Sequence, residues 1–462
     1  MSAHAFNAHQ EGSPIEDLVG IGFGPSNLAL AIAIEEHNRV NPDDAVRSSF
    51  IERQETFGWH RGMLLEGATM QVSFLKDLVT MRDPGSPFTF LRYLHDHDRL
   101  ADFINQKSFF PTRLEFHDYL RWCAAEFGDR VSYGQSAVAL RPVENDGLIE
   151  SVDVVSRGVR DPAAESVTRT RNIAVGTGLT PRLPDGVTLG EHVWHNRDLL
   201  FRADEIKERP RRRFAVVGAG QSAAETADYL HRTFPDAEVC AVFARYGYSP
   251  ADDSPFANRI FDPAAVDDYY QAPEEYKQAL MRYHGNTNYG VVDGELIEQL
   301  YRTVYQEKLA GVERLRILNA TALVGIEELP DGARVVIRSL VDGEQSTLDC
   351  DAVVLATGYR PSDPRTLLGP LADACLTDEQ GQLRIDRDHR LLMADHVRVG
   401  VYLQGGGTEH THGITSSLLS TLAVRSGEIC DSLLLGRTER HVRAQLDAEA
   451  ADAADGLATH AN

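Results

Sequence analysis

The sequence predicts an α/β protein with two Rossmann-like dinucleotide-binding units. Two glycine-rich turns predict this class: GIGFGP at 20–25 follows an apolar strand at 17–21, and GAGQSA at 218–223 follows an apolar strand at 213–217. A helix and then a further apolar strand follow each turn, which is the order of a doubly wound parallel sheet. In both places, a backbone turn and a helix N-terminus can bind a pyrophosphate.

Composition excludes several other classes. The 462 residues contain 46 Lys and Arg against 69 Asp and Glu, which gives a net charge of −23. This acidic balance disfavours nucleic-acid partners and anionic membrane surfaces. The five cysteines are scattered without a CxxC pair, as in a reducing cytosol. We therefore expect a cytoplasmic protein with no secretory signal, no membrane partner and no metal site.

The first unit is expected to continue with a helix at 28–36 and a strand at 49–52. Residues 60–115 should be irregular, because prolines at 84, 87 and 111 interrupt any long helix. An apolar strand at 172–178 follows. A Pro- and Arg-rich stretch at 203–213 then marks a domain boundary.

The second unit should contain a helix at 224–231 and a strand at 237–243. Two helices over 265–310, separated at 285–290, come next, followed by short strands over 315–350. A buried strand at 351–358 ends in another small-residue turn. The polar residues 1–14 and the Ala- and Asp-rich tail from about 445 are expected to be disordered or frayed.

The first turn offers a set of cofactor-binding candidates. Its glycines allow close approach to a pyrophosphate, and Glu52, which ends the next strand, can accept ribose hydroxyls. A ligand-free turn and a solvated surface acid are the alternatives. The candidates in the turn itself are Gly20, Gly22, Gly24 and Pro25.

The second turn offers Gly218, Gly220, Gln221 and Ser222. No acid follows its strand at 237–243; Arg245 follows instead. A cation here suits a 2′-phosphate and favours NADPH over NADH, although a plain surface arginine is the alternative. Two dinucleotides in one chain indicate a flavin and a nicotinamide that exchange hydride. The lack of a close cysteine pair disfavours disulfide reductases.

Six ordered segments make the prediction more specific. They are FGWHRGM at 57–63, MQVSFLKDL with RDP at 70–84, DDSPFAN at 252–258, NTNY at 286–289, LATGY at 355–359 and HGITSSLLS at 412–420. In these segments the sequence resembles the flavin-dependent N-hydroxylating monooxygenases, and within them the L-ornithine N5-monooxygenases of siderophore pathways, from about residue 15 to 435. Pro25 in place of a third glycine is usual in that family.

The resemblance implies roles for individual residues. FAD would be bound by the first turn and Glu52, with Ala137 at the adenine, and NADPH by the second turn with Arg245. Gln71 and Asn288 would act at the reacting centre. The flavin would be approached or covered by Trp59, His60, Leu65, Ser417, Leu418 and Leu419, and NADPH would also contact Asn288 and Tyr289.

The amino-acid substrate would be bound by Lys76 at its carboxylate, Asn258 at its α-amino group, Asn288 at the amine that is oxidised, and Ser420. A zwitterion needs such a cation and such amides. The alternatives are a lysine that extends to the surface and asparagines that only form turns. EHTH at 409–412 has metal-ligand residue types, but a flavin-side loop is the favoured interpretation.

These roles imply that NADPH reduces FAD, that NADP⁺ stays bound, and that a C4a-hydroperoxyflavin transfers oxygen to the neutral side-chain amine. The expected product is N5-hydroxy-L-ornithine, made by a homotetramer. L-Lysine or a decarboxylated diamine as substrate, a peroxide-releasing NADPH oxidase or reductase, and a redox-sensing flavoprotein are the alternatives. The expected domains are FAD-binding at 15–207 and 352–440, NADPH-binding at 208–351 with a helical substrate segment at about 248–300, and a flexible tail at 441–462.

Overall fold

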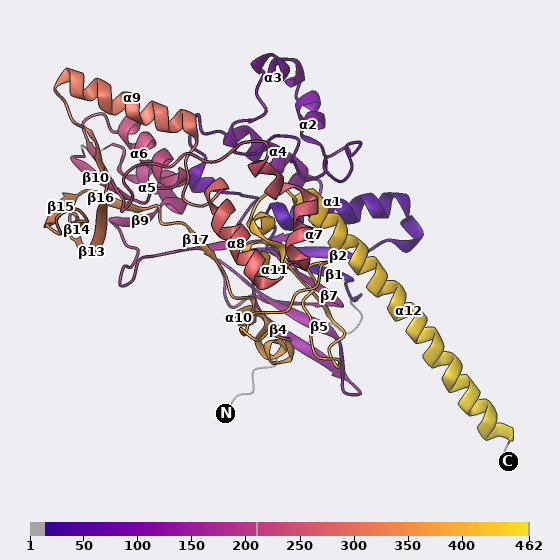
Figure 1. The fold of residues 1–462 in the computed structure, drawn as a ribbon. Coiled ribbons are helices and arrows are strands. Elements are labelled where there is room, and N and C mark those ends of the chain that lie inside the picture. The colour runs from indigo at the N-terminus through magenta and orange to yellow at the C-terminus, as the bar shows by residue number, and fades with distance from the viewer. Residues whose placement is uncertain (1–13, 209–210, 461–462) are drawn as a thin grey trace.

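The structure is a computed structural model that describes residues 14–208 and 211–460 (Figure 1). Disorder is expected for residues 1–14, and residues 1–13 lie outside the described range. Within that range no helix is long and apolar enough to cross a membrane.

The first sheet has five parallel strands in the order β18-β7-β1-β2-β3. Four of them are buried along almost their whole length, as a parallel sheet covered on both faces requires. Helix α1 (Pro25–Val40) follows β1 and packs its buried Leu28–Ile34 stretch into the core. The strands are β1 (Leu18–Ile21), β2 (Ser48–Glu52), β3 (Val131–Tyr133), β7 (Asn172–Val175) and β18 (Gly400–Leu403).

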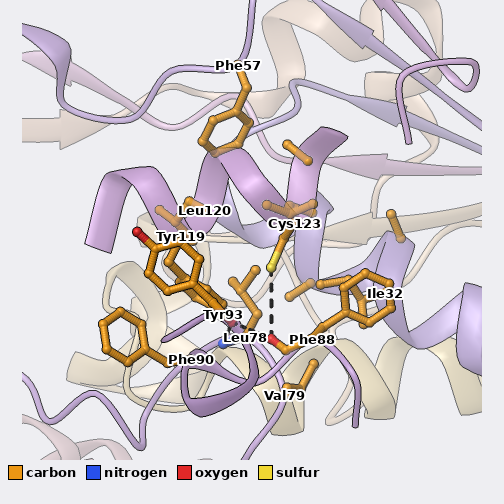
Figure 2. Close-up of a cluster of buried hydrophobic side chains, with 14 of the residues drawn as sticks. Ile32, Phe57, Leu78, Val79, Phe88, Phe90, Tyr93, Tyr119, Leu120 and Cys123 are labelled. Carbon is orange, nitrogen blue, oxygen red and sulfur yellow. Dashed lines mark hydrogen bonds between the residues drawn. The ribbon is translucent and has the colours of Figure 1, made fainter. Parts of the chain in front are cut away.

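The stretch of chain that connects β2 to β3 forms a helical layer. The expected irregular region at 60–115 contains short helices, because Thr89 and Thr112 cap new helix starts after the prolines. An aromatic core joins this layer to α1, and Figure 2 shows Tyr119 and Cys123 at its centre. The helices are α2 (Phe90–Asp96), α3 (Leu100–Gln106) and α4 (Arg113–Ala125).

The second sheet has the order β12-β11-β10-β16-β9 and is also parallel. Strands β9 and β16 lie outside the expected limits of 208 and 351, because β16 pairs with β10 on one side and β9 on the other. The strands of the second sheet therefore extend from residue 193 to residue 355. Its elements are β9 (Val193–His195), α5 (Leu199–Ile206), β10 (Arg213–Val217), α6 (Gln221–Thr233), β11 (Glu238–Val242), α9 (Gly294–Ala310), β12 (Leu315–Leu318) and β16 (Ala352–Leu355).

Antiparallel strands complete the two units. One three-stranded sheet, absent from the sequence-based expectation, follows β3, and another fills the expected strand region at 315–350. Strands β8 and β17 pair where the chain passes between the units. The strands are β4 (Gln135–Asn145), β5 (Leu148–Gly158), β6 (Glu165–Thr170), β8 (Leu179–Pro181), β13 (Thr321–Leu329), β14 (Gly332–Ser339), β15 (Gln345–Cys350) and β17 (Tyr359–Pro361).

Two helical regions differ from expectation. Residues 263–310 form three helices rather than two, because Pro273 separates α7 (Pro263–Gln271) from α8 (Glu274–His284). The expected flexible tail continues helix α12 (Leu422–His460), which projects from the body in Figure 1. Its many alanines favour helix. The remaining helices are α10 (Pro364–Leu368) and α11 (Glu409–His412).

Candidate active site

The first glycine turn forms an open helix N-terminus. Gly22 has φ +85°, and a Cβ there would lie 2.4 Å from the Gly176 carbonyl oxygen, so only glycine fits. Gly24 is the N-cap of α1, no described side chain caps this end, and a Cβ at Gly24 would meet no described atom within 4 Å. Pro25 occupies the first turn of α1. Uncapped N–H groups beside open space fit a pyrophosphate.

Asn27 fixes this turn and was missed in the sequence. Its buried side-chain amide donates to the Gly22 carbonyl oxygen at 2.6 Å and accepts from Gln404 at 2.8 Å. The signal was an asparagine among the apolar residues of α1. Gly20 is glycine for a packing reason, because a Cβ would lie 2.2 Å from the Phe50 ring.

Glu52 is buried at the end of β2 and faces the same turn. Its two oxygens accept from the backbone N–H groups of Phe23 at 2.7 Å and Gln54 at 2.8 Å. Each carboxylate oxygen has a second lone pair, so a ribose hydroxyl can still be accepted. Ala137 is half-buried at a bulge of β4. Both cofactor contacts stay predictions.

The second turn repeats the arrangement. Gly218 has φ +142°, and a Cβ there would lie 2.3 Å from the Ala356 carbonyl oxygen. Gly220 is the N-cap of α6, which no described side chain caps, and Gly290 lies against it. Arg245 is exposed beyond β11 and donates to the Gly290 carbonyl oxygen. This geometry fits a second pyrophosphate with a cation beside it.

Two other predicted residues of this turn already contact protein. Gln221 accepts from the Asp293 N–H at 2.8 Å and donates to Glu225 at 3.0 Å, while the Ser222 carbonyl accepts from Thr226 at 2.6 Å. The Glu225 carboxylate also accepts hydrogen bonds from both terminal nitrogens of the Arg113 guanidinium, at 2.7 and 2.9 Å, and so joins α4 to α6. The sequence signal for Glu225, an acid within an alanine-rich helix, was missed.

Lys76 lies against the short helical segment that contains Asn258. The Lys76 ammonium lies 5.9 Å from the centroid of the Phe261 ring, and burial lowers its pKa while Asp262 opposes that shift. Asn258 lies in the same short helical segment, Ala257–Phe261, and donates from its side chain to the Asp253 carbonyl at 2.8 Å. A half-buried cation near the segment that carries an amide suits a zwitterion.

Tyr289 joins the loop before α9 to α11. Its hydroxyl donates to the Glu409 carboxylate, and the side chains of Ser417 and Asn288 lie near that hydroxyl. Burial, followed by Glu409, raises the Tyr289 pKa, and the Ser417 and Asn288 contacts oppose that rise. Three predicted site residues from two distant segments therefore meet at one hydroxyl.

The EHTH string does not converge on one point. Glu409 contacts Tyr289, His410 donates to the Leu383 carbonyl at 2.8 Å, and His412 donates to the Arg387 carbonyl at 3.1 Å. Among the described residues no group of three or more His, Cys, Asp or Glu side chains could bind a metal ion.

The other predicted residues vary in burial. Trp59 and Leu419 pack against the first aromatic core, and His60 lies on the surface with φ +49° and its ring 4.7 Å from that of Trp59. Leu65 is buried in the core of the second unit, and Gln71 is exposed. Leu418 is half-buried, and Ser420 is buried. Their contacts with flavin or substrate stay predictions.

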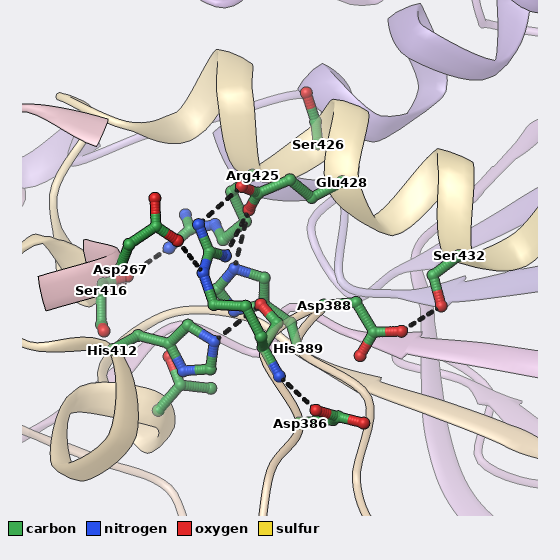
Figure 3. A network of polar contacts seen from close by, with 12 residues as sticks. Asp267, Asp386, Asp388, His389, His412, Ser416, Arg425, Ser426, Glu428 and Ser432 are labelled. Carbon is green, nitrogen blue, oxygen red and sulfur yellow. Dashed lines mark hydrogen bonds and ion pairs between the residues drawn. The ribbon is translucent and has the colours of Figure 1, made fainter. Parts of the chain in front are cut away.

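Arg425 supports the loop that carries Ser417–Ser420, and the sequence did not single it out. Its buried guanidinium donates to the Ser416 carbonyl at 2.6 Å and to the Ser26 hydroxyl at 3.3 Å. Burial lowers its pKa to about 10. Figure 3 shows it beside Glu428 and the stacked rings of His389 and His412. This network connects the loop to the first turn of α1.

Known proteins share this architecture. The chain is 43% identical over 404 residues to an L-ornithine N(5)-monooxygenase of Burkholderia cepacia, covering 86% of this chain and 89% of that protein. An ornithine N-hydroxylase of Kutzneria sp. 744, solved with reduced FAD, NADP⁺ and L-ornithine, has a TM-score of 0.86 at 48% identity, covering 91% of this chain and 99% of that one.

A lysine-specific relative is more distant. The L-lysine 6-monooxygenase of Pseudomonas syringae has a TM-score of 0.79 at 30% identity, covering 91% of this chain and 99% of that one. The model of the family L-lysine 6-monooxygenase/L-ornithine 5-monooxygenase matches residues 14–361. Together with the two glycine turns, this match shows that the chain belongs to the L-lysine 6-monooxygenase/L-ornithine 5-monooxygenase family.

Proposed function

We propose that this protein is an FAD- and NADPH-dependent L-ornithine N5-monooxygenase that uses O₂ to form N5-hydroxy-L-ornithine. The observation that carries the proposal is the match, at 48% identity over 91% of the chain, to an ornithine N-hydroxylase solved with both cofactors and ornithine. The two uncapped helix N-termini behind Gly22 and Gly218 supply matching sites in this chain.

Bound FAD, once reduced by NADPH, supplies the activated oxygen. The protein supplies position. Lys76 pairs with the substrate carboxylate, and Asn258 accepts from the α-amino group. Asn288 orients the side-chain amine, while Ser417, Leu418 and Leu419 exclude water. The amine must be neutral, because an ammonium has no lone pair to react with.

A substrate panel tests the proposal. NADPH oxidation, hydroxylamine and peroxide are measured with L-ornithine, L-lysine, 1,4-diaminobutane and no amine. We expect hydroxylamine mainly from L-ornithine. Hydroxylamine mainly from L-lysine would move the assignment to the other branch of the family. Peroxide alone with every amine would favour an NADPH oxidase.

The product would feed siderophore or related natural-product biosynthesis, the enzyme would be a homotetramer, and it would act in the cytoplasm. The resemblance to siderophore-pathway enzymes supports the first two. The acidic composition and the scattered cysteines support the third. Light scattering of the FAD-loaded protein measures the oligomeric state.

A further inference from the structure

Glu409 hydrogen-bonds with Tyr289, the neighbour in sequence of the residue expected to face the amine. It is half-buried in α11, and its carboxylate accepts from the Tyr289 hydroxyl. That hydroxyl also lies near the side chains of Asn288, which is expected to face the amine, and Ser417, which is expected to face the flavin. None of the roles that the family resemblance implies involves Glu409.

The reaction also requires a proton acceptor. A lysine-type ammonium has a pKa of about 10.4, so at neutral pH almost all of the substrate enters protonated. Before the amine nitrogen can attack, one proton must leave it. Lys76 is a cation, and Asn258 and Asn288 are amides, so none of them can accept this proton.

We propose that Glu409 accepts the proton of the substrate amine through Tyr289. The ammonium transfers a proton to the Tyr289 oxygen while the Tyr289 hydroxyl proton moves to the Glu409 carboxylate. The products are a neutral amine and a neutral carboxylic acid, and Tyr289 ends in its initial state. This inference rests on the proposed amine-hydroxylating function.

Burial favours this transfer. Desolvation penalises both charged members of an ammonium–carboxylate pair, so the two pKa values move toward each other. Glu409 is half-buried here, while Tyr289 is 42% exposed. Burial raises the Glu409 pKa, and the Tyr289 hydrogen bond opposes that rise.

The titratable groups around Glu409 are few among the described residues. Tyr289 from the loop before α9 and Tyr269 from α7 face it. On its own helix, the rings of His410 and His412 donate to the carbonyls of Leu383 and Arg387. No described cation forms an ion pair with Glu409, so the carboxylate is available to take a proton.

The test compares Glu409→Gln and Tyr289→Phe with a control, Glu379→Gln, whose side chain is exposed in the turn at 379–380. Pre-reduced, FAD- and NADP⁺-loaded enzyme is mixed with L-ornithine and O₂ from pH 6.5 to 9.5, and hydroxylamine yield is measured. Both test variants should lose yield by roughly 100-fold at pH 7, as for loss of a general base. The yield of both test variants should recover as the pH approaches the pKa of the free substrate ammonium. The control variant should match wild type.

A second readout does not depend on turnover. Infrared difference spectra are recorded as L-ornithine is added to the oxidised enzyme with NADP⁺. Wild type should gain the C=O stretch of a protonated carboxyl group, and Glu409→Gln and Tyr289→Phe should not. Absence of this band in wild type, or an unchanged pH profile in Glu409→Gln, would overturn the inference. Wild type that makes no hydroxylamine at any pH would contradict the proposed function instead.

Discussion

The Arg245 guanidinium donates a hydrogen bond to the carbonyl oxygen of Gly290, and Gly290 in turn lies against the N-cap of α6. The cation that follows β11 is therefore tied to the loop that carries Asn288 and Tyr289. Arg245 can thus both bind the nicotinamide cofactor and hold the loop that carries Asn288 and Tyr289 in place.

Arg245→Ala should weaken NADPH binding about 10- to 100-fold and NADH binding much less, because only NADPH carries the 2′-phosphate. Arg245→Gln separates the two roles, since its amide can still donate to Gly290 but carries no charge. Flavin-reduction kinetics with each nucleotide measure the effect. Equal weakening of NADPH and NADH in both variants would make Arg245 purely structural.

Gly22→Ala should abolish or strongly reduce FAD binding. Its φ of +85° is strained for alanine, and the new Cβ would lie 2.4 Å from the Gly176 carbonyl oxygen. Gly67→Ala is the matched control, because Gly67 has φ +80° but no described atom within 4 Å of the Cβ position. FAD content after purification measures the difference. Similar FAD content in the two variants would mean that the close approach at Gly22 is unimportant.

Lys76→Ala should raise the KM for L-ornithine about 10- to 100-fold, because a charge-assisted pair with a carboxylate contributes roughly 1.5–3 kcal/mol. Lys277→Ala provides a control, since Lys277 is in α8 and its ammonium lies over the ring of Tyr269 in α7. The rate of flavin reduction by NADPH should stay near that of wild type in both variants. An unchanged KM for Lys76→Ala would refute the carboxylate assignment.

The histidine pair in Figure 3 should make stability fall in mild acid. Burial, and then the neighbouring His389, lowers the His412 pKa to about 3. Below pH 6.5 the unfolded chain binds a proton at this histidine and the folded protein does not, so stability should decrease from pH 6.5 toward pH 3. His412→Gln should flatten this slope by up to about 1.4 kcal/mol per pH unit.

Melting temperatures at pH 7, 6, 5 and 4 measure this slope. His95→Gln is the control, because the His95 side chain is 69% exposed. A slope unchanged by His412→Gln would mean that the acid sensitivity comes from other groups.

Local patterns predicted the two parallel sheets well. Apolar strands followed by GIGFGP and GAGQSA determine a turn geometry almost by themselves, and β10 matches its expected range of 213–217. The same local patterns could not assign β9 and β16 to the second sheet, because three- and four-residue strands acquire a partner only through long-range pairing.

The site shows the same division. Resemblance named Lys76, Asn288, Tyr289 and Ser417, and the structure brings the last three together. Sequence reasoning did not assign roles to Asn27, Arg425 and Glu409, since each acts through contacts with residues more than 100 positions away. Of these three residues, Asn27 had a usable signal, a polar residue within an apolar helix.

The central claim is that this enzyme places one oxygen atom of O₂ on the side-chain nitrogen of L-ornithine. The most direct measurement is mass spectrometry of the product formed from L-ornithine, NADPH and ¹⁸O₂. We expect N5-hydroxy-L-ornithine that carries one ¹⁸O atom, in near-equal amount to the NADPH consumed. NADPH consumption that yields only labelled peroxide, with ornithine unchanged, would contradict the claim.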